Sequence, residues 1–359
     1  MAGGSWDPTS LPTRPGLYIN FQSAAAAQIK GGARGVVAIP LRTYTGGTAT
    51  AKTIYTVDNE ADAAALFGAA NIQSIKFALG AGAKEVLVYT QPAYSSGTYA
   101  QDMIDMRTTF DAYPFNVFVA DGNDTNLTAT EQGNILTWCQ TNKTDGKHFM
   151  VVFGAVPATA STDDLNSATG DARSVLLTDD YAVNLINGVT VNGSTYTSHQ
   201  YASYIAGLIA GTPINKSITY SVVPVSDVTK RLTNSQVKTS LSKGSLVLTN
   251  DGDKVKVEQG ITTAVSKIRT IRARQAVSTD ITKTASDSYI GKLNNNADGQ
   301  ATLIAAVKAY LEQLEVNNVL TGPVVALDPN RPSVGDTVYL SVSYVEVDSM
   351  ERIFLTINV

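Results

Sequence analysis

The sequence has one cysteine and two histidines, and this scarcity excludes several kinds of site. Cys139 alone cannot form a disulfide within the chain or a zinc site built from several thiolates. The imidazoles of His148 and His199 leave little material for acid–base catalysis, and no Gly-x-Ser-x-Gly nucleophile motif accompanies them. We therefore predict no catalytic residue, no metal site and no enzymatic activity.

Charge is also scarce. Only 16% of the 359 residues are charged, and the net charge is −4, whereas soluble proteins usually have about 25% charged residues. Because the net charge is small, the chain is not expected to bind nucleic acid through bulk electrostatics. A surface with so few charges is typical of a protein that self-associates or is covered by neighbours.

Phosphate-binding motifs and long apolar runs are missing as well. The sequence contains neither Gly-x-Gly-x-x-Gly nor Gly-x-x-x-x-Gly-Lys-Ser/Thr, so no nucleotide cofactor is expected. Residues 121–124 resemble half of a calcium loop, but its twelfth position is Gln132, which predicts a turn instead. No run of 18 apolar residues occurs, and residues 1–15 do not have the pattern of a secretion signal, so we expect no membrane insertion.

Strand-like and helix-like segments alternate over much of the chain, which predicts an open parallel sheet covered by helices. Strands are expected at residues 35–41, 53–57, 85–89, 115–120, 149–153 and 174–177. Helices are expected at 60–67, 72–79, 100–110, 130–141, 162–168 and 199–209. One face of the last helix is made of small residues, including Ala206 and Gly207, and tight internal packing is the favoured interpretation. Hairpin turns are expected at residues 192–193 and 250–253.

After about residue 235 the pattern changes. Helices are expected at residues 234–241, 279–293 and 301–316, and strands at 324–326, 337–347 and 352–359. The densest basic stretch, residues 267–276, alternates in part between apolar and basic side chains.

Both ends of the chain are candidates for extended arms. Residues 16–21 are β-prone and lie between a proline-punctuated lead-in and the glycines of residues 31–35, although an ordinary first strand of the chain's own sheet fits equally well. The last residues, 353–359, are apolar and β-branched, and an exposed strand of this kind promotes aggregation. It must therefore pair with another strand.

The resulting fold class is multidomain, α/β and α+β, with an open-sheet central domain and extended terminal β-arms. The expected divisions are an arm and hinge (1–33), a small β-rich domain (34–90), a central α/β domain (91–235), an α+β domain (236–347) and a C-terminal β-arm (348–359).

Five stretches resemble the tail sheath proteins of contractile phage tails and of phage-tail-like bacteriocins. They are residues 80–86, 202–217, 244–261, 291–299 and 347–354. The resemblance runs from about residue 15 to the C-terminus, and the chain is short for the family, which implies that it lacks large insertions.

The resemblance implies a structural subunit that forms hexameric rings stacked as a helical cylinder around a tail tube. Contraction of the cylinder would drive the tube through the target cell envelope, followed in a phage by genome ejection. The implied partners are copies of the chain itself, the tail tube protein, and the baseplate and tail-terminator proteins. The implied location is a virion tail or bacteriocin particle, made in the host bacterial cytoplasm.

The resemblance also assigns roles to individual residues, with hinges at residues 31–35 and 348–350. The N-terminal arm would pair with a neighbour through Gly16, Leu17, Tyr18, Ile19 and Phe21. The C-terminal arm would use Ile353, Phe354, Leu355, Thr356 and Ile357. The recipient strand would include Val338, Leu340, Val342 and Tyr344. Lys292 or Lys308 would face the tube, unless both are ordinary solvated lysines.

Two other functions stay open from the residues alone. An α/β-domain hydrolase-like enzyme would need a cleft with converging, perturbed titratable groups. Another self-assembling tube or shell protein would share the low charge and the β-prone ends, and microscopy of the purified protein would distinguish it.

Overall fold

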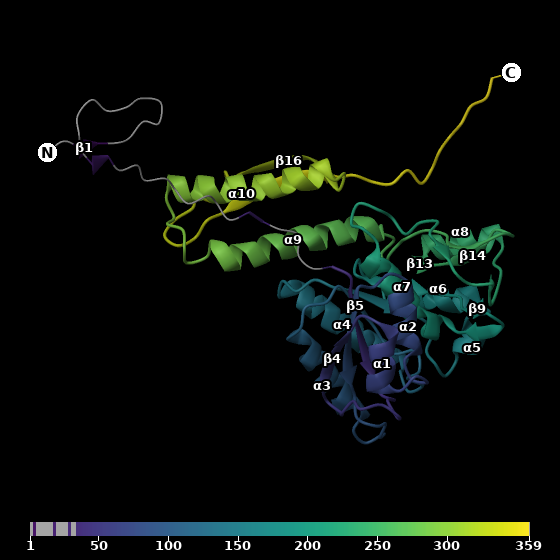
Figure 1. The fold of residues 1–359 in the computed structure, drawn as a ribbon. Helices are drawn as coiled ribbons and strands as arrows, with labels where there is room; N and C mark the ends of the chain where they lie inside the picture. The colour runs from purple at the N-terminus through teal and green to yellow at the C-terminus, as the bar shows by residue number, and fades with distance from the viewer. Residues whose placement is uncertain (1–2, 5–16, 19–27, 30–33, 359) are drawn as a thin grey trace.

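A computed structural model describes residues 3–4, 17–18, 28–29 and 34–358. An α/β body holds most of the chain, and a module of two long helices and a hairpin projects from it (Figure 1). We call residues 34–267 the α/β body, residues 268–346 the C-terminal module and residues 347–358 the C-terminal tail.

The body is built on a seven-stranded sheet with the order β13-β8-β7-β6-β3-β5-β4. Only β4 runs antiparallel to its neighbour. Its strands are β3 (Val36–Leu41), β4 (Ile54–Val57), β5 (Glu85–Thr90), β6 (Val117–Val119), β7 (Met150–Phe153), β8 (Ala182–Leu185) and β13 (Ser245–Leu246). The parallel strands are apolar and buried along nearly their whole length, as expected for a sheet covered on both faces. The predicted fold class is confirmed. This one sheet takes strands from both sides of the domain boundaries expected at residues 90 and 235.

Helices cover both faces of the sheet. Helices α2 and α7 pack together on one face, and α3 and α4 pack together on the other (Figure 1). The body's helices are α1 (Glu60–Phe67), α2 (Gln73–Gly80), α3 (Tyr99–Asp111), α4 (Ala129–Thr144), α5 (Ala160–Asp163), α6 (Ser167–Leu176), α7 (Ser198–Gly211) and α8 (Asn234–Ser242). The small face of α7 lies against α2 so closely that a Cβ on Gly207 would be 2.2 Å from Ala78 O. The favoured interpretation, tight internal packing, is confirmed.

The strand predicted at residues 174–177 is wrong, because these residues belong to the end of α6 and the turn that follows it. Asn166 caps this helix by accepting a hydrogen bond from Ala168 N, and Ser174 Oγ donates to Gly170 O one turn earlier. The place in the sheet is taken by β8, which begins a few residues later. A β-prone run of four residues is too short to outweigh a capped helix that precedes it.

The small sheets of the body confirm both predicted hairpins. At residues 192–193, Asn192 and Gly193 have φ values of 49° and 82°, which a type I′ turn requires. One sheet contains β9 (Val189–Val191), β10 (Ser194–Tyr196) and β12 (Asp227–Val228). The other contains β11 (Val222–Val223), β14 (Leu248–Asn250) and β15 (Val255–Val257).

The C-terminal module consists of α9 (Ile268–Ser288), α10 (Ala297–Val316), β16 (Leu320–Leu327) and β17 (Leu340–Glu346). Its own core combines Ala273 and Val277 of α9 with Val307, Leu311 and Leu314 of α10. The helix predicted at residues 279–293 is misplaced, because α9 begins at Ile268 and contains most of the basic stretch. Ile268 and Ile271 are three residues apart, which is a helical spacing, and both are buried. The partial alternation of apolar and basic residues therefore reflects one buried face of α9.

A candidate assembly surface on the C-terminal module

Strands β16 and β17 form an antiparallel hairpin that packs against α10. In the described part of the chain these two strands pair only with each other, so each has an outer backbone edge without a partner strand. The edge of β17 is regular, whereas the pairing of β16 shifts between Thr321 and Val324, around Pro323, which has no N–H to donate. Open edges of this kind are templates for an added strand.

The structure places three of the four predicted recipient residues on β17. Leu340 and Tyr344 are partly buried against the core of the module, and Val342 is more exposed. Val338 precedes the strand. An added strand would therefore meet the backbone of β17, while Leu340 and Tyr344 stay packed in their own subunit.

The C-terminal tail leaves the molecule without forming a strand (Figure 1). Phe354 is 92% exposed, and Ile353 and Leu355 are each 80% exposed. Thr356 and Ile357 are exposed as well. The strand predicted at residues 352–359 is not formed over residues 352–358 of this single chain, because none of the strands in the described residues pairs with them to complete a ladder.

The N-terminal segment is described only in part. Gly16, Ile19 and Phe21 lie outside the described residues, whereas β2 (Leu17–Tyr18) pairs in parallel with β1 (Gly3–Gly4). Nearer the body, Ile29 is 4% exposed and belongs to the core of the C-terminal module. The N-terminal segment therefore contacts the module before it enters the body at β3.

A buried carboxylate ties this entry point to both long helices. Asp280 on α9 accepts a hydrogen bond of 2.5 Å from Arg34 Nη2 and another of 2.5 Å from Tyr310 Oη on α10. The Asp280 side chain is 2% exposed, so its charge depends on these partners. The start of β3 is thus fixed relative to the module.

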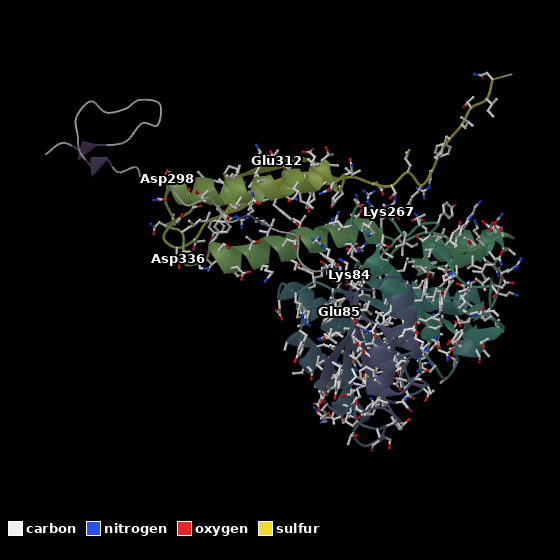
Figure 2. The ribbon with its side chains drawn as sticks, viewed as in Figure 1. Lys84, Glu85, Lys267, Asp298, Glu312 and Asp336 are labelled. Carbon is white, nitrogen blue, oxygen red and sulfur yellow. The ribbon has the colours of Figure 1, made fainter. Side chains whose placement is uncertain are left out.

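The two lysines predicted to face a tube lie on different elements. Lys308 is on α10, and its side chain is 53% exposed and lies 3.7 Å from Glu312. Figure 2 labels Glu312 on this helix. Lys292 lies beyond the end of α9, where its Nζ donates to Asp287 O.

In the body, both histidines bridge structural elements. His148 Nδ1 lies 3.0 Å from Tyr181 Oη, and its Nε2 lies 2.9 Å from Ser278 Oγ of α9. His199 Nε2 lies 3.1 Å from Asp124 O, and burial lowers the pKa of both imidazoles. Burial likewise raises the pKa of the Cys139 thiol, which donates to Phe149 O. His148 therefore links the body to the C-terminal module, whereas the contacts of His199 and Cys139 lie within the body.

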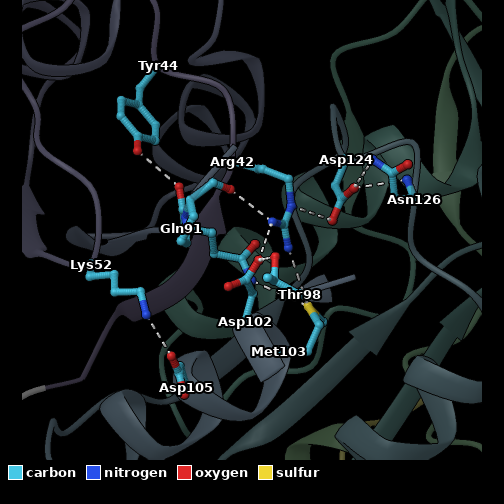
Figure 3. A network of polar contacts seen from close by, with 11 residues as sticks. Arg42, Tyr44, Lys52, Gln91, Thr98, Asp102, Met103, Asp105, Asp124 and Asn126 are labelled. Atoms are coloured by element: carbon cyan, nitrogen blue, oxygen red, sulfur yellow. Dashed lines mark hydrogen bonds and ion pairs between the residues drawn. The ribbon is translucent and has the colours of Figure 1, made fainter. Parts of the chain in front are cut away.

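A cavity of about 510 Å³ lies beyond the carboxyl ends of β3, β5 and β6, where open α/β sheets often bind ligands. Arg42 borders it and is 7% exposed. Its guanidinium is 3.3 Å from Asp102 and 3.9 Å from Asp124, and it donates to Pro92 O (Figure 3). Because carboxylates already neutralise Arg42, the network connects α3 to the neighbouring loops and offers no free charge to an anion.

Within the described residues, no His, Cys, Asp and Glu side chains are grouped so that three could hold a metal ion. No described helix is both long and apolar enough to cross a membrane.

Two family models match consecutive parts of the chain. The model of the phage tail sheath protein central domain matches residues 97–263, and that of the phage tail sheath C-terminal domain matches residues 262–359. A tail sheath protein of Clostridium phage phiCD119 is 26% identical over 142 residues, which are 37% of this chain. The matched stretch spans 40% of that relative's length.

Solved structures share the fold over almost the whole chain. The sheath tail protein of Desulfitobacterium hafniense has a TM-score of 0.73 at 19% identity, covering 95% of this chain and 99% of its own. The helical sheath of the anti-feeding prophage in its contracted state has a TM-score of 0.72 at 16% identity, covering 97% and 99%. None of these matches favours the hydrolase-like alternative.

Proposed function

Because this chain belongs to the family of phage tail sheath proteins, we propose that it polymerises as a helical cylinder around a tail tube and contracts to drive the tube through a cell envelope. The observation that carries this proposal is a pair of complementary features on one chain. Among the residues that the structure describes, the hairpin has open backbone edges, and the C-terminal tail has an apolar, β-prone segment that no strand pairs with.

Each copy can therefore give a strand and receive one. If the tail of one copy pairs with the β17 edge of the next, the contact is heterologous, and a heterologous contact that does not close produces a helical polymer. The donor residues would be Ile353, Phe354, Leu355, Thr356 and Ile357. The N-terminal residues Gly16, Leu17, Tyr18, Ile19 and Phe21 would serve another neighbour in the same way. Such links rest on main-chain hydrogen bonds, which tolerate movement of the surrounding side chains.

Contraction follows from these links as a mechanical step. The bodies of neighbouring copies can change their mutual contacts while the added strands keep the copies connected. The energy would be stored in the contacts between copies, which requires no nucleotide and no catalytic group. The proposed polymer is built from hexameric rings. Its partners would be the tube protein, the baseplate proteins and the tail-terminator protein. The subunit would be made in the host cytoplasm and would belong to the tail of a virion or bacteriocin particle. Lys292 or Lys308 would contact the tube.

The test separates backbone pairing from side-chain packing. Deletion of residues 352–359 should leave folded monomers that form no cylinders in negative-stain microscopy. Leu355→Pro removes a backbone N–H from the added strand and should also prevent polymerisation, whereas Leu355→Ala keeps that N–H and should still polymerise. Normal cylinders from the deletion variant would refute the arm exchange. Particles of another shape from the unaltered chain would favour a different self-assembling protein.

A further inference from the structure

The start of the C-terminal tail is fastened to the α/β body. Glu351, the last residue before the free segment, has a side chain that is only 7% exposed. Four donors from three separate parts of the chain surround its carboxylate. They are Thr219 Oγ1 at 2.8 Å and Ser217 Oγ at 3.4 Å from Oε1, and Gln259 Nε2 at 3.0 Å and Lys267 Nζ at 3.2 Å from Oε2.

These donors are themselves held in place. Thr219 Oγ1 also accepts from Gly260 N at 3.0 Å, and Ser217 Oγ accepts from Thr219 N at 3.1 Å. Lys267 is the N-cap residue of α9, where the helix dipole favours a negative charge. A buried carboxylate is stable only when charged and polar partners satisfy it, and both oxygens of Glu351 have such partners. The arrangement is therefore a preformed site for this side chain.

Contacts just before Glu351 guide the tail to this site along α9. Glu346 at the end of β17 accepts from Arg274 Nε at 2.5 Å, and Asp348 accepts from Lys267 Nζ at 2.5 Å. Ser349 Oγ accepts from Arg269 Nη1 at 3.1 Å. Beyond Glu351, residues 352–358 make no hydrogen bond or ion pair to another described residue. The segment 348–350, expected to be a hinge, is thus attached by its side chains.

We propose that Glu351 is a positioning residue that fixes where the C-terminal arm leaves the subunit for a second copy of this chain. This rests on the proposed function. The pivot of the arm then lies after Glu351, immediately before the donor segment. A pivot at Asp348 would add three residues of free chain, or about 10 Å of reach. A shorter free segment raises the effective concentration of the arm near its target edge.

The location of the site has a mechanical consequence. The four donors to Glu351 all belong to the body, which ends at Lys267, whereas the hairpin that receives a neighbour's arm belongs to the C-terminal module. A body that rotates therefore moves the origin of its own arm directly. The arm exchange would transmit the movement of one body to the hairpin of the next copy.

The experiment compares Glu351→Gln with the matched control Glu312→Gln, an exposed acid on α10. A dye on Arg352→Cys reports the mobility of the tail, since the native Cys139 is buried and does not compete for labelling. We expect Glu351→Gln to lower the dye anisotropy of the monomer and to raise the critical concentration for polymerisation about tenfold or more. Glu312→Gln should change neither quantity.

Gln259→Ala removes a single donor to Glu351 and keeps the carboxylate. It should shift both readouts in the same direction by a smaller amount, and it serves as the second variant if Glu351→Gln folds poorly. An unchanged anisotropy in Glu351→Gln, or an unchanged critical concentration, would overturn the positioning role. Loss of polymerisation on deletion of residues 352–359 would then still support arm exchange, whereas normal polymerisation of the deletion variant would refute the proposed function itself.

Discussion

Substitution of two helical glycines should change stability in opposite directions. At Gly133 in α4, a Cβ would have no heavy atom within 4 Å apart from those of its chain neighbours and its own helix backbone, whereas a Cβ on Gly207 in α7 would lie 2.2 Å from Ala78 O and 2.7 Å from Ala78 Cα. Both residues lie inside helices, where alanine is favoured over glycine by about 1 kcal/mol. Only the surroundings of the two glycines differ. Comparing the two substitutions therefore isolates the contribution of α7–α2 packing to stability.

The expected magnitudes follow from this geometry. Gly133→Ala should raise the free energy of unfolding by about 1 kcal/mol. In Gly207→Ala the obstructing atoms are backbone and cannot rotate away, so α2 and α7 must separate. We expect the upper end of the overpacking range, about 3 kcal/mol, against a propensity gain of about 1 kcal/mol. The net effect is a loss of about 2 kcal/mol.

Urea unfolding of the full chain, under conditions where light scattering shows monomers, measures both effects. The transition midpoint should rise for Gly133→Ala and fall for Gly207→Ala, with an unchanged slope. A Gly207→Ala variant as stable as the unaltered chain would refute the close packing of α2 on α7. A destabilised Gly133→Ala would show that helix propensity does not control that site.

Two further predictions concern charge. Burial raises the pKa of Asp121 to about 7 from 3.8, so the unfolded chain releases a proton that the folded chain keeps as pH rises from 3.8 to about 7. Between pH 5 and pH 8 this should cost about 2 to 3 kcal/mol of stability, and Asp121→Asn should remove that part of the pH dependence in urea unfolding. Lys308→Glu should weaken co-sedimentation of the subunit with tail tubes, most strongly at low salt. Unchanged co-sedimentation at every salt concentration would remove Lys308 from the tube contact.

Four of the parallel strands, β3, β5, β6 and β7, could be predicted from the sequence because each lies in a nearly continuous apolar run between turn signals. The helix expected at residues 60–67 has those bounds in the structure, and its N-cap Asn59 accepts a hydrogen bond from Asp62 N. Local signals of this kind need no knowledge of distant contacts.

The errors occur where distant contacts decide. Residues 174–176 belong to a helix that is capped locally by Asn166 and is also held from a distance, because Ser174 Oγ lies 2.8 Å from Ser245 Oγ on β13. The attachment of Glu351 depends in the same way on Ser217, Thr219 and Gln259, which no local pattern connects. The sequence motif around Glu351 marked this segment for the family resemblance, but only the fold shows what holds it.

The lengths of the sheet edges bear on how faithfully copies recognise one another. The large sheet ends in β13, with two residues, on one side and in β4, with four, on the other, whereas β17 offers seven. Short edges give a colliding strand few hydrogen bonds, so accidental pairing with the body is brief. At a high concentration of identical subunits, strands that pair with the short edges of the body would dissociate quickly, whereas strands that pair with the hairpin would stay bound longer. The body's short edges would thus act as a proofreading feature of assembly.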